Sequence, residues 1–288
     1  MGQIGRFAAV VGMIGGWLLG SVSGVLADDG AESLMREVWS RLRNLETERE
    51  VLDVLIVAAP EKERFAPADV PAFLRDRPRG VVYKRATRSI RYARDGADKL
   101  HVVFSEPRED RGTAVLVWRK PGEDTDDQWL FLPALKRVRR IPASSTQTFA
   151  GTDFSYEDVR QITSEPMERF QYVREGEAEI DGRPCTLVRA TPKPGTVTAY
   201  GSRVIAITKD SLFPYRTSYY DPQGALWKVQ DNAEPREVAP GVWRPALTEM
   251  RDVKLKETTL LSFVNREVNP AIPSEVFTQD YLERWTGE

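Results

Sequence analysis

Turn signals divide the second half of the chain into short apolar segments. They fall at Asp181-Gly182, Pro194-Gly195, Pro222 to Gly224 and Pro240-Gly241. The segments predicted as strands are residues 185–190, 203–208, 215–220, 226–230, 242–250 and 258–264. Strands this short, with no helical pattern between neighbours, predict an antiparallel meander.

The first half continues this pattern and adds a helix. Predicted strands cover residues 50–59, two segments of 79–103 that turn at Gly96, and residues 112–120. Apolar residues recur at helical spacing in residues 32–45, which predicts an amphipathic helix with one face that needs a partner. A second helix is expected at residues 275–285. The fold class is therefore mainly β with a few helices.

Two segments stand apart from the strand pattern. Arg6 precedes an uncharged run that ends near Ala27, which is typical of a secretory signal cleaved after Ala27, a retained membrane anchor being the alternative. Residues 60–80 are rich in proline and charge, and we interpret them as an insertion with at most one helical turn. A plain surface loop is the favoured reading, and a lid or partner contact is the alternative.

Composition sets limits on function. Of the 288 residues, 41% are hydrophobic and 29% charged, as in a globular protein with a sizeable core. The formal net charge of -2 predicts no bulk attraction to nucleic acid. One cysteine, Cys185, leaves no internal disulfide, and we expect it to be a small buried residue rather than a reactive thiol. With no repeat and no linker, residues 28–288 are predicted to form one domain.

Residues 128–159 carry the most distinctive pattern. Residues 129–132 are too apolar for a solvent-facing strand and are stopped by Pro133, so a strand covered on both faces is expected. Four cations, Lys136, Arg137, Arg139 and Arg140, then surround Val138, as in a strand that leaves the covered region for water. Ser155 followed by Asp158 has the spacing of a helix N-cap, which starts a short helix at Tyr156.

This stretch resembles a known family. The order WLFLPALKRVRRI, a polar spacer and FAGTDFSYEDV is similar to the periplasmic outer-membrane lipoprotein-sorting proteins, the LolA-like family, often found with transporters of the RND or MMPL type. Weaker similarity extends to residues 112–118 and 276–284. The resemblance implies a half-open antiparallel β-barrel with a helical lid around an apolar cavity for acyl chains.

The search for chemistry is mostly negative. The single histidine, His101, has no sequence-adjacent nucleophile or metal ligand, so a structural role is expected. Nucleotide, phosphate-loop and nucleophile-elbow motifs are missing from the sequence. The acidic residues 123–127 lack the spacing of a calcium loop and predict a solvated hairpin tip. Adjacent Glu157 and Asp158 are explained by the helix dipole. We expect no catalytic residue, metal or cofactor.

Aromatic residues near the central stretch either line a ligand cavity or fill a core, and the resemblance favours the cavity. These candidates are Trp118, Trp129, Phe131, Phe149, Phe154 and Tyr156. The basic cluster is either a surface for a transporter or anionic head groups, or a solvated strand end. The expected function is a periplasmic carrier of lipid or lipoprotein acyl chains between an inner-membrane RND/MMPL-type transporter and an outer-membrane acceptor. A fixed accessory subunit and a lipid-modifying enzyme are the alternatives.

Overall fold

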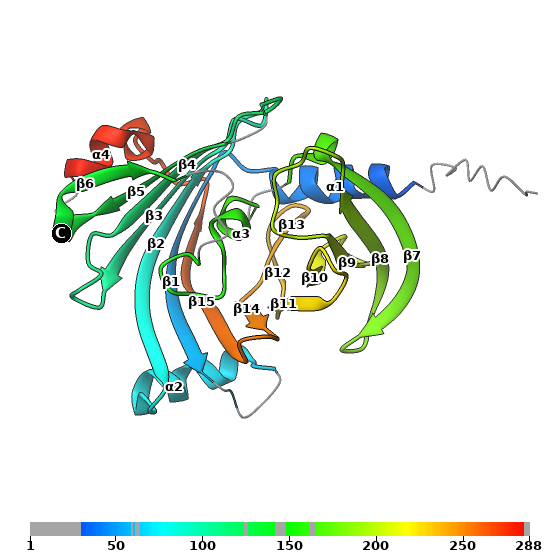
Figure 1. Ribbon diagram of the computed structural model, residues 1–288, viewed down its shortest axis with the longest axis horizontal. Coiled ribbons are helices and arrows are strands. Elements are labelled where there is room, and N and C mark those ends of the chain that lie inside the picture. Colours follow the sequence, from blue (N-terminus) through cyan, green and yellow to red (C-terminus); the bar gives the residue numbers. More distant parts are fainter. Residues whose placement is uncertain are drawn as a thin grey trace, which may run out of the picture.

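One large antiparallel sheet dominates the protein. The computed structural model describes residues 30–58, 60, 64–123, 126–141, 148–161 and 165–284, so the predicted signal segment lies outside the described residues. The sheet has 13 strands in the order β6-β5-β4-β3-β2-β1-β15-β14-β11-β10-β9-β8-β7. Figure 1 shows that it curves around α3 without closing, because β6 and β7 are free edges. The predicted fold class, a half-open antiparallel barrel, is confirmed.

The elements follow the turn signals closely. The strands of the large sheet are β1 (Thr47–Ala58), β2 (Val81–Arg91), β3 (Lys99–Glu106), β4 (Ala114–Trp118), β5 (Asp127–Leu132), β6 (Arg137–Arg140), β7 (Phe170–Ile180), β8 (Arg183–Pro192), β9 (Ser202–Thr208), β10 (Pro214–Tyr220), β11 (Leu226–Ala233), β14 (Leu247–Asp252) and β15 (Glu257–Val268). A two-stranded sheet pairs β12 (Arg236–Ala239) with β13 (Val242–Arg244). The α-helices are α1 (Ala31–Leu42), α2 (Val70–Asp76), α3 (Tyr156–Gln161) and α4 (Gln279–Arg284).

Two predicted elements are interrupted. The strand expected over residues 242–250 is divided into β13 and β14 at Pro245, which has no N–H to give to a ladder. The closing helix expected over residues 275–285 is a 3-10 turn, Ser274–Phe277, followed by the short α4. No helix in the described ranges has the length and apolar character needed to cross a membrane.

Side chains alternate between two covered faces of the sheet. On β3, Leu100, Val102 and Phe104 join a core cluster with α3 on the concave face, which we call the inner face. Val103 points the opposite way and packs with Phe277 beside α4 on the outer face. Both faces of β3 to β5 are therefore apolar, as expected for a strand covered on both sides.

Two other helices cover the remaining wall. The apolar side of α1 packs on β7, β8 and β9, so the predicted amphipathic helix has found its partner in the sheet. Residues 64–76 pack on β1, β2, β14 and β15 through Phe65 and Val70. The prediction of a plain surface loop with at most one helical turn is wrong, because α2 forms and Phe65 is buried. Burying such a side chain contributes roughly 1.5–3 kcal/mol.

Candidate functional site

A short segment fills the hollow of the sheet. Residues 148–161, which we call the plug, begin with a tight loop in which Phe149 N–H donates to the Phe154 carbonyl at 2.7 Å. Ala150 and Gly151 turn the chain with φ of 51° and 75°, a left-handed conformation that glycine adopts without cost. Figure 1 places α3 inside the concave face.

The helix start inside the plug is the one that the sequence predicts. Ser155 N–H donates to Asp158 Oδ2 at 2.7 Å, and Asp158 N–H donates to Ser155 Oγ at 3.1 Å, which together form a capping box. Asp158 has further partners in the sheet. Tyr200 donates its hydroxyl to this carboxylate, and Lys228 Nζ lies 3.5 Å from Oδ2. The cap therefore also fastens the plug to the sheet.

An apolar cavity lies between the plug and the inner face. Its volume is ≈ 40 Å³. The sheet contributes Leu52, Val54, Ala86, Val102 and Phe104, and the plug contributes Phe149, Phe154 and Val159. Arg88 and Leu261 stand at its side and also line the larger cavity described next.

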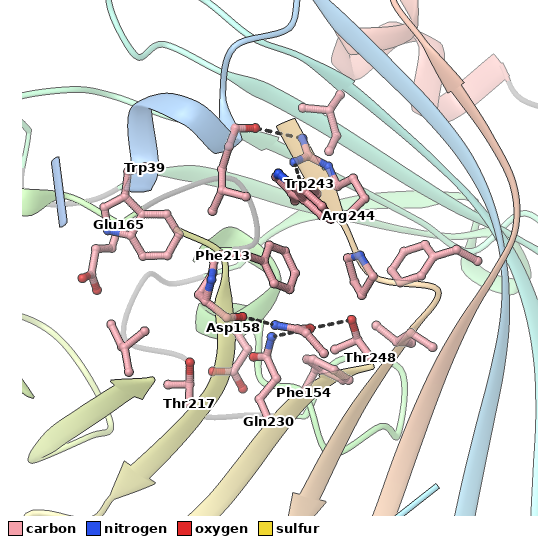
Figure 2. Close-up of a pocket in the computed structure, with 18 of the residues that line it drawn as sticks. Trp39, Phe154, Asp158, Glu165, Phe213, Thr217, Gln230, Trp243, Arg244 and Thr248 are labelled. Carbon is pink, nitrogen blue, oxygen red and sulfur yellow. Dashed lines mark hydrogen bonds between the residues drawn. The ribbon is translucent and has the colours of Figure 1, made fainter. Parts of the chain in front are cut away.

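A second, more polar cavity of ≈ 120 Å³ shares Arg88, Phe154 and Leu261 with the first. Figure 2 shows Phe154 and Asp158 of the plug, Gln230 and Thr248 of the sheet and Trp39 of α1 around it. Sequence reasoning missed this cavity, because its polar residues come from many separate strands, from α3 and from loops, and form no motif.

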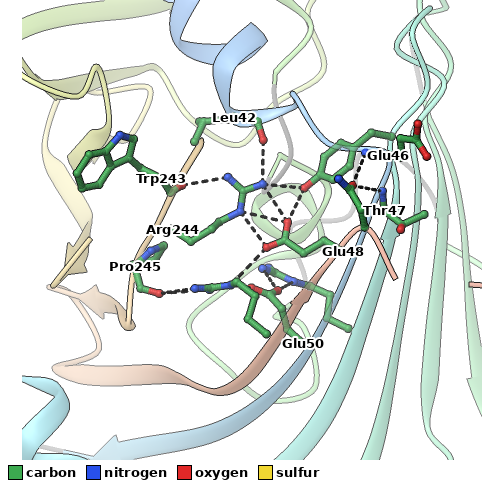
Figure 3. A network of polar contacts seen from close by, with 12 residues as sticks. Leu42, Glu46, Thr47, Glu48, Glu50, Trp243, Arg244 and Pro245 are labelled. Atoms are coloured by element: carbon green, nitrogen blue, oxygen red, sulfur yellow. Dashed lines mark hydrogen bonds and ion pairs between the residues drawn. The ribbon is translucent and has the colours of Figure 1, made fainter. Parts of the chain in front are cut away.

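Buried ion pairs surround the polar cavity. Arg244 donates to Glu48 through Nε at 3.0 Å and Nη2 at 2.9 Å, and Tyr92 donates its hydroxyl to Glu48 Oε2 at 2.8 Å (Figure 3). Burial opposes ionisation of Glu48, yet the charge and hydrogen bonds of Arg244 lower its pKa to about 2. This carboxylate is therefore ionised at any physiological pH.

The same network extends along β1. Glu50 accepts from Arg266 Nε at 2.6 Å and from Arg88 Nε at 2.6 Å. On the other side of the cavity, Arg203 pairs with Glu165, which also accepts the hydroxyl of Tyr172 at 2.6 Å. Buried charges of this kind are stable only when paired and hydrogen-bonded.

The six candidate aromatic residues divide between the two faces. Phe149, Phe154 and Tyr156 lie together in the inner cluster, and Phe149 meets Tyr156 edge-on with ring centroids 5.5 Å apart. Trp118, Trp129 and Phe131 lie in the outer cluster. Trp118 Nε1 donates to the Phe277 carbonyl at 2.8 Å, which fixes the C-terminal turn on the outer face. Of the six, Phe149 and Phe154 line the two cavities described above.

The four basic candidates lie at the free edge β6 and the turn before it. Arg137, Arg139 and Arg140 are exposed on β6, and Lys136 is exposed with φ of 46° in the turn. Arg140 pairs with Asp127, whereas Lys136, Arg137 and Arg139 have no ion-pair partner among the described residues. The acidic hairpin tip is also engaged in pairing, since Lys120 contacts Glu123 at 2.9 Å.

The remaining titratable candidates have structural surroundings. His101 is buried on the outer face against Tyr281, with ring centroids 5.6 Å apart, and burial lowers its pKa to about 4. Cys185 is a free, buried thiol whose pKa burial raises. In the part of the chain that the structure describes, no group of three or more His, Cys, Asp or Glu residues could hold a metal ion.

An open sheet with a plugged, partly apolar hollow defines a LolA-like fold, and solved structures show the same. A structure described as an outer membrane lipoprotein-sorting protein domain from Vibrio parahaemolyticus has a TM-score of 0.76 and 21% identity over 88% of this chain and 98% of its own. The structure of a DUF1329 family protein from Desulfovibrio piger has a TM-score of 0.75 and 22% sequence identity, and the match covers 88% of this chain and 98% of that protein. The structure of a LolA superfamily protein from Nitrosomonas europaea has a TM-score of 0.61 and 18% sequence identity, and the match covers 87% of this chain and 98% of that protein.

The sequence itself matches one family model. That model, described as "Uncharacterized protein", covers residues 96–284, and the chain belongs to this family. No curated protein matches the chain. The resemblance to lipoprotein-sorting proteins is confirmed as a likeness of fold. The association with RND- or MMPL-type transporters stays a prediction.

Proposed function

We propose that this protein is a periplasmic carrier that holds the acyl chain of a lipid or lipoprotein against the inner face of its sheet. The observation that supports this most is the apolar cavity between the plug and the sheet. Its wall belongs to a cluster of buried apolar side chains that includes Leu100, Val102 and Phe104. The likeness to lipoprotein-sorting structures supports the same function.

Loading requires the plug to move. Sites that enclose a ligand have volumes of about 300–1,000 Å³, whereas the two cavities measure ≈ 40 and ≈ 120 Å³. The two cavities are therefore too small to enclose an acyl chain in this arrangement of the plug. Phe149, Phe154 and Val159 occupy the hollow, and an acyl chain that displaced them would meet the same apolar wall.

The energetics indicate why a partner is needed. Each buried methylene is worth roughly 0.8 kcal/mol, so exposing a chain of about 16 carbons to water costs on the order of 13 kcal/mol. Transfer from a bilayer to an apolar cavity is nearly neutral by the same reasoning. An inner-membrane transporter of the RND or MMPL type would supply the energy for loading, and an outer-membrane acceptor would receive the lipid.

Native mass spectrometry of protein isolated from its own periplasm tests this function. We expect a fraction of the protein to carry an intact lipid or acylated peptide, and the delipidated protein to bind a fluorescent fatty acid. Protein that carries no lipid and binds no fatty acid would rule out the carrier function. Protein found only in a membrane complex would favour the fixed accessory subunit, and hydrolysed lipid would favour an enzyme.

A further inference from the structure

Arg88 is the one arginine that lines both cavities. It lies on β2, its side chain is 6% exposed, and it stands where the apolar and polar cavities meet. Glu50 is its ion-pair partner, contacted through Nε and Nη2. A guanidinium carries five N–H donors in a planar fork, and Nη1 of Arg88 has no hydrogen-bond partner among the described residues.

The neighbouring arginines of the network are more fully occupied. Arg244 donates through all three nitrogens, to Glu48 and to the Trp243 and Leu42 carbonyls. Arg266 donates to Glu50 and, through both terminal nitrogens, to the Pro245 carbonyl. Arg88 thus has hydrogen-bonding capacity that the protein itself does not use.

The charge of this network is also unbalanced. The contacts join three arginines, Arg88, Arg244 and Arg266, to two glutamates, Glu48 and Glu50. One positive charge therefore has no counter-charge within a group whose side chains are buried except for the partly exposed Arg266. A buried excess charge is costly unless an opposite charge pairs with it.

We infer that Arg88 binds the anionic head group of a single-chain amphiphile whose acyl chain occupies the apolar cavity. This rests on the proposed function and narrows its ligand class to an acyl chain ending in a carboxylate or phosphate. Bidentate pairing with a guanidinium suits both groups. Phe149 and Val102 would then contact the chain, while the polar cavity accommodates the rest of the head group.

The test compares ligands that share one chain. Binding of palmitic acid, 1-palmitoyl lysophosphatidic acid, methyl palmitate and a triacylated lipopeptide to the delipidated full chain is measured by displacement of a fluorescent fatty acid. An anionic head should raise affinity over methyl palmitate by roughly ten- to a hundredfold, as a hydrogen bond to a charged group does. The two anionic ligands distinguish the carboxylate source from the phosphate source.

Variants assign this preference to a residue. Arg88→Gln leaves two arginines against two glutamates, so we expect it to fold and to bind palmitic acid and methyl palmitate equally. Arg88→Lys keeps the charge but loses the planar fork, so it should weaken the preference for the acid without abolishing it. Arg266→Gln is the matched control, because it removes the same charge from the same network at a residue that lines neither cavity, and it should keep the preference.

Each outcome decides between the inferences. Equal affinity of wild-type protein for palmitic acid and methyl palmitate, or tighter binding of the lipopeptide, would overturn the anionic ligand while leaving the carrier in place. Loss of the preference in Arg266→Gln as well as Arg88→Gln would overturn Arg88 as the anchor. If Arg88→Gln fails to fold, a preference in Arg88→Lys as large as that of the wild-type protein would overturn it, and a weakened preference would support it. Failure of every ligand to bind would remove the proposed function itself.

Discussion

The hydroxyl of Tyr200 donates to both carboxylate oxygens of Asp158, at 2.9 and 3.0 Å. This contact joins α3 of the plug to the residues that lead into β9. Both side chains are buried, so the hydrogen bond is shielded from competing water.

We expect Tyr200→Phe to loosen the plug. Loss of the donor leaves a buried carboxylate with one partner fewer, which should lower the free energy of unfolding by about 1–3 kcal/mol. Amide exchange of residues 148–161 and the rate of fatty-acid uptake should both increase. Tyr215→Phe is the control, because its hydroxyl donates to Asp181 at 2.9 Å away from the plug. Equal exchange rates in the two variants would contradict the role of Tyr200.

Phe149→Asp and Phe131→Asp should separate the two faces of the sheet. Both phenylalanines are buried, so each charge costs several kcal/mol of stability. Phe149 lines the apolar cavity, so its variant should lose fatty-acid binding; Phe131 packs on the outer face, so its variant should keep it. Fatty-acid titration and a thermal melt check both. A folded Phe131→Asp variant that no longer binds fatty acid would contradict this assignment. If either variant fails to fold, Phe149→Leu and Phe131→Leu repeat the comparison.

Asp153 should make stability depend on pH. Burial, with the charges of Glu257 and Asp252 adding to it, raises its pKa to about 6, although Thr259 donates to it and Lys228 lies nearby. The folded state therefore holds a proton that the unfolded state releases between about pH 4 and pH 6, so this contribution is present at low pH and lost as pH rises. Two pKa units correspond to roughly 3 kcal/mol.

The variant Asp153→Asn removes that dependence. Asparagine can still accept from Thr259, so the variant should exceed wild-type stability above pH 7 by up to roughly 3 kcal/mol and match it near pH 4. The quantity to measure is the difference in unfolding free energy between Asp153→Asn and the wild-type protein at each pH. His101 is present in both proteins, and because its pKa is lowered to about 4, its contribution to stability is lost as pH falls. A difference in unfolding free energy that does not change with pH would contradict the prediction.

Arg137→Glu with Arg139→Glu tests the basic edge. These exposed arginines lie on β6, an edge strand among the strands that the structure describes. We expect their reversal to weaken binding to vesicles containing anionic lipid. The effect should fade as salt rises, since screening acts over about 10 Å at 0.1 M. Arg174→Glu with Arg189→Glu, at the opposite end of the sheet, is the control. Unchanged vesicle binding at low salt would leave only a solvated strand end.

The sequence predicts strands and turns well because both depend on local residues. Gly96 and Pro121-Gly122 end their strands as expected, and Ser155 caps α3 through the predicted spacing. The sequence does not reveal which face of a strand is the inner one. Trp129 and Phe131 alternate with Leu130 on a strand that is apolar on both sides, so periodicity alone could not assign them to the outer face.

The polar cavity was beyond sequence reasoning for a related cause. Glu48 and Glu50 alternate along β1 in the manner of a solvent-facing strand side, yet both are buried. Their partners Arg88, Arg244 and Arg266 are far away in the chain and become neighbours only through the strand order. The alternation shows which residues share a face of the strand, but tertiary packing determines whether that face is exposed to solvent.

The pairing of β1 with β15 also has a consequence for how the protein acquires its shape. β1 to β6 form one run of neighbouring strands and β7 to β15 supply the other, and the two runs meet only at β1 and β15. Hairpins within each run involve nearby residues and can form early. In contrast, Glu48 pairs with Val268, which lies near the far end of the chain. Such distant pairing slows folding. The hollow can form only after β15 has paired with β1, and until then β1 presents an unpaired edge to other chains.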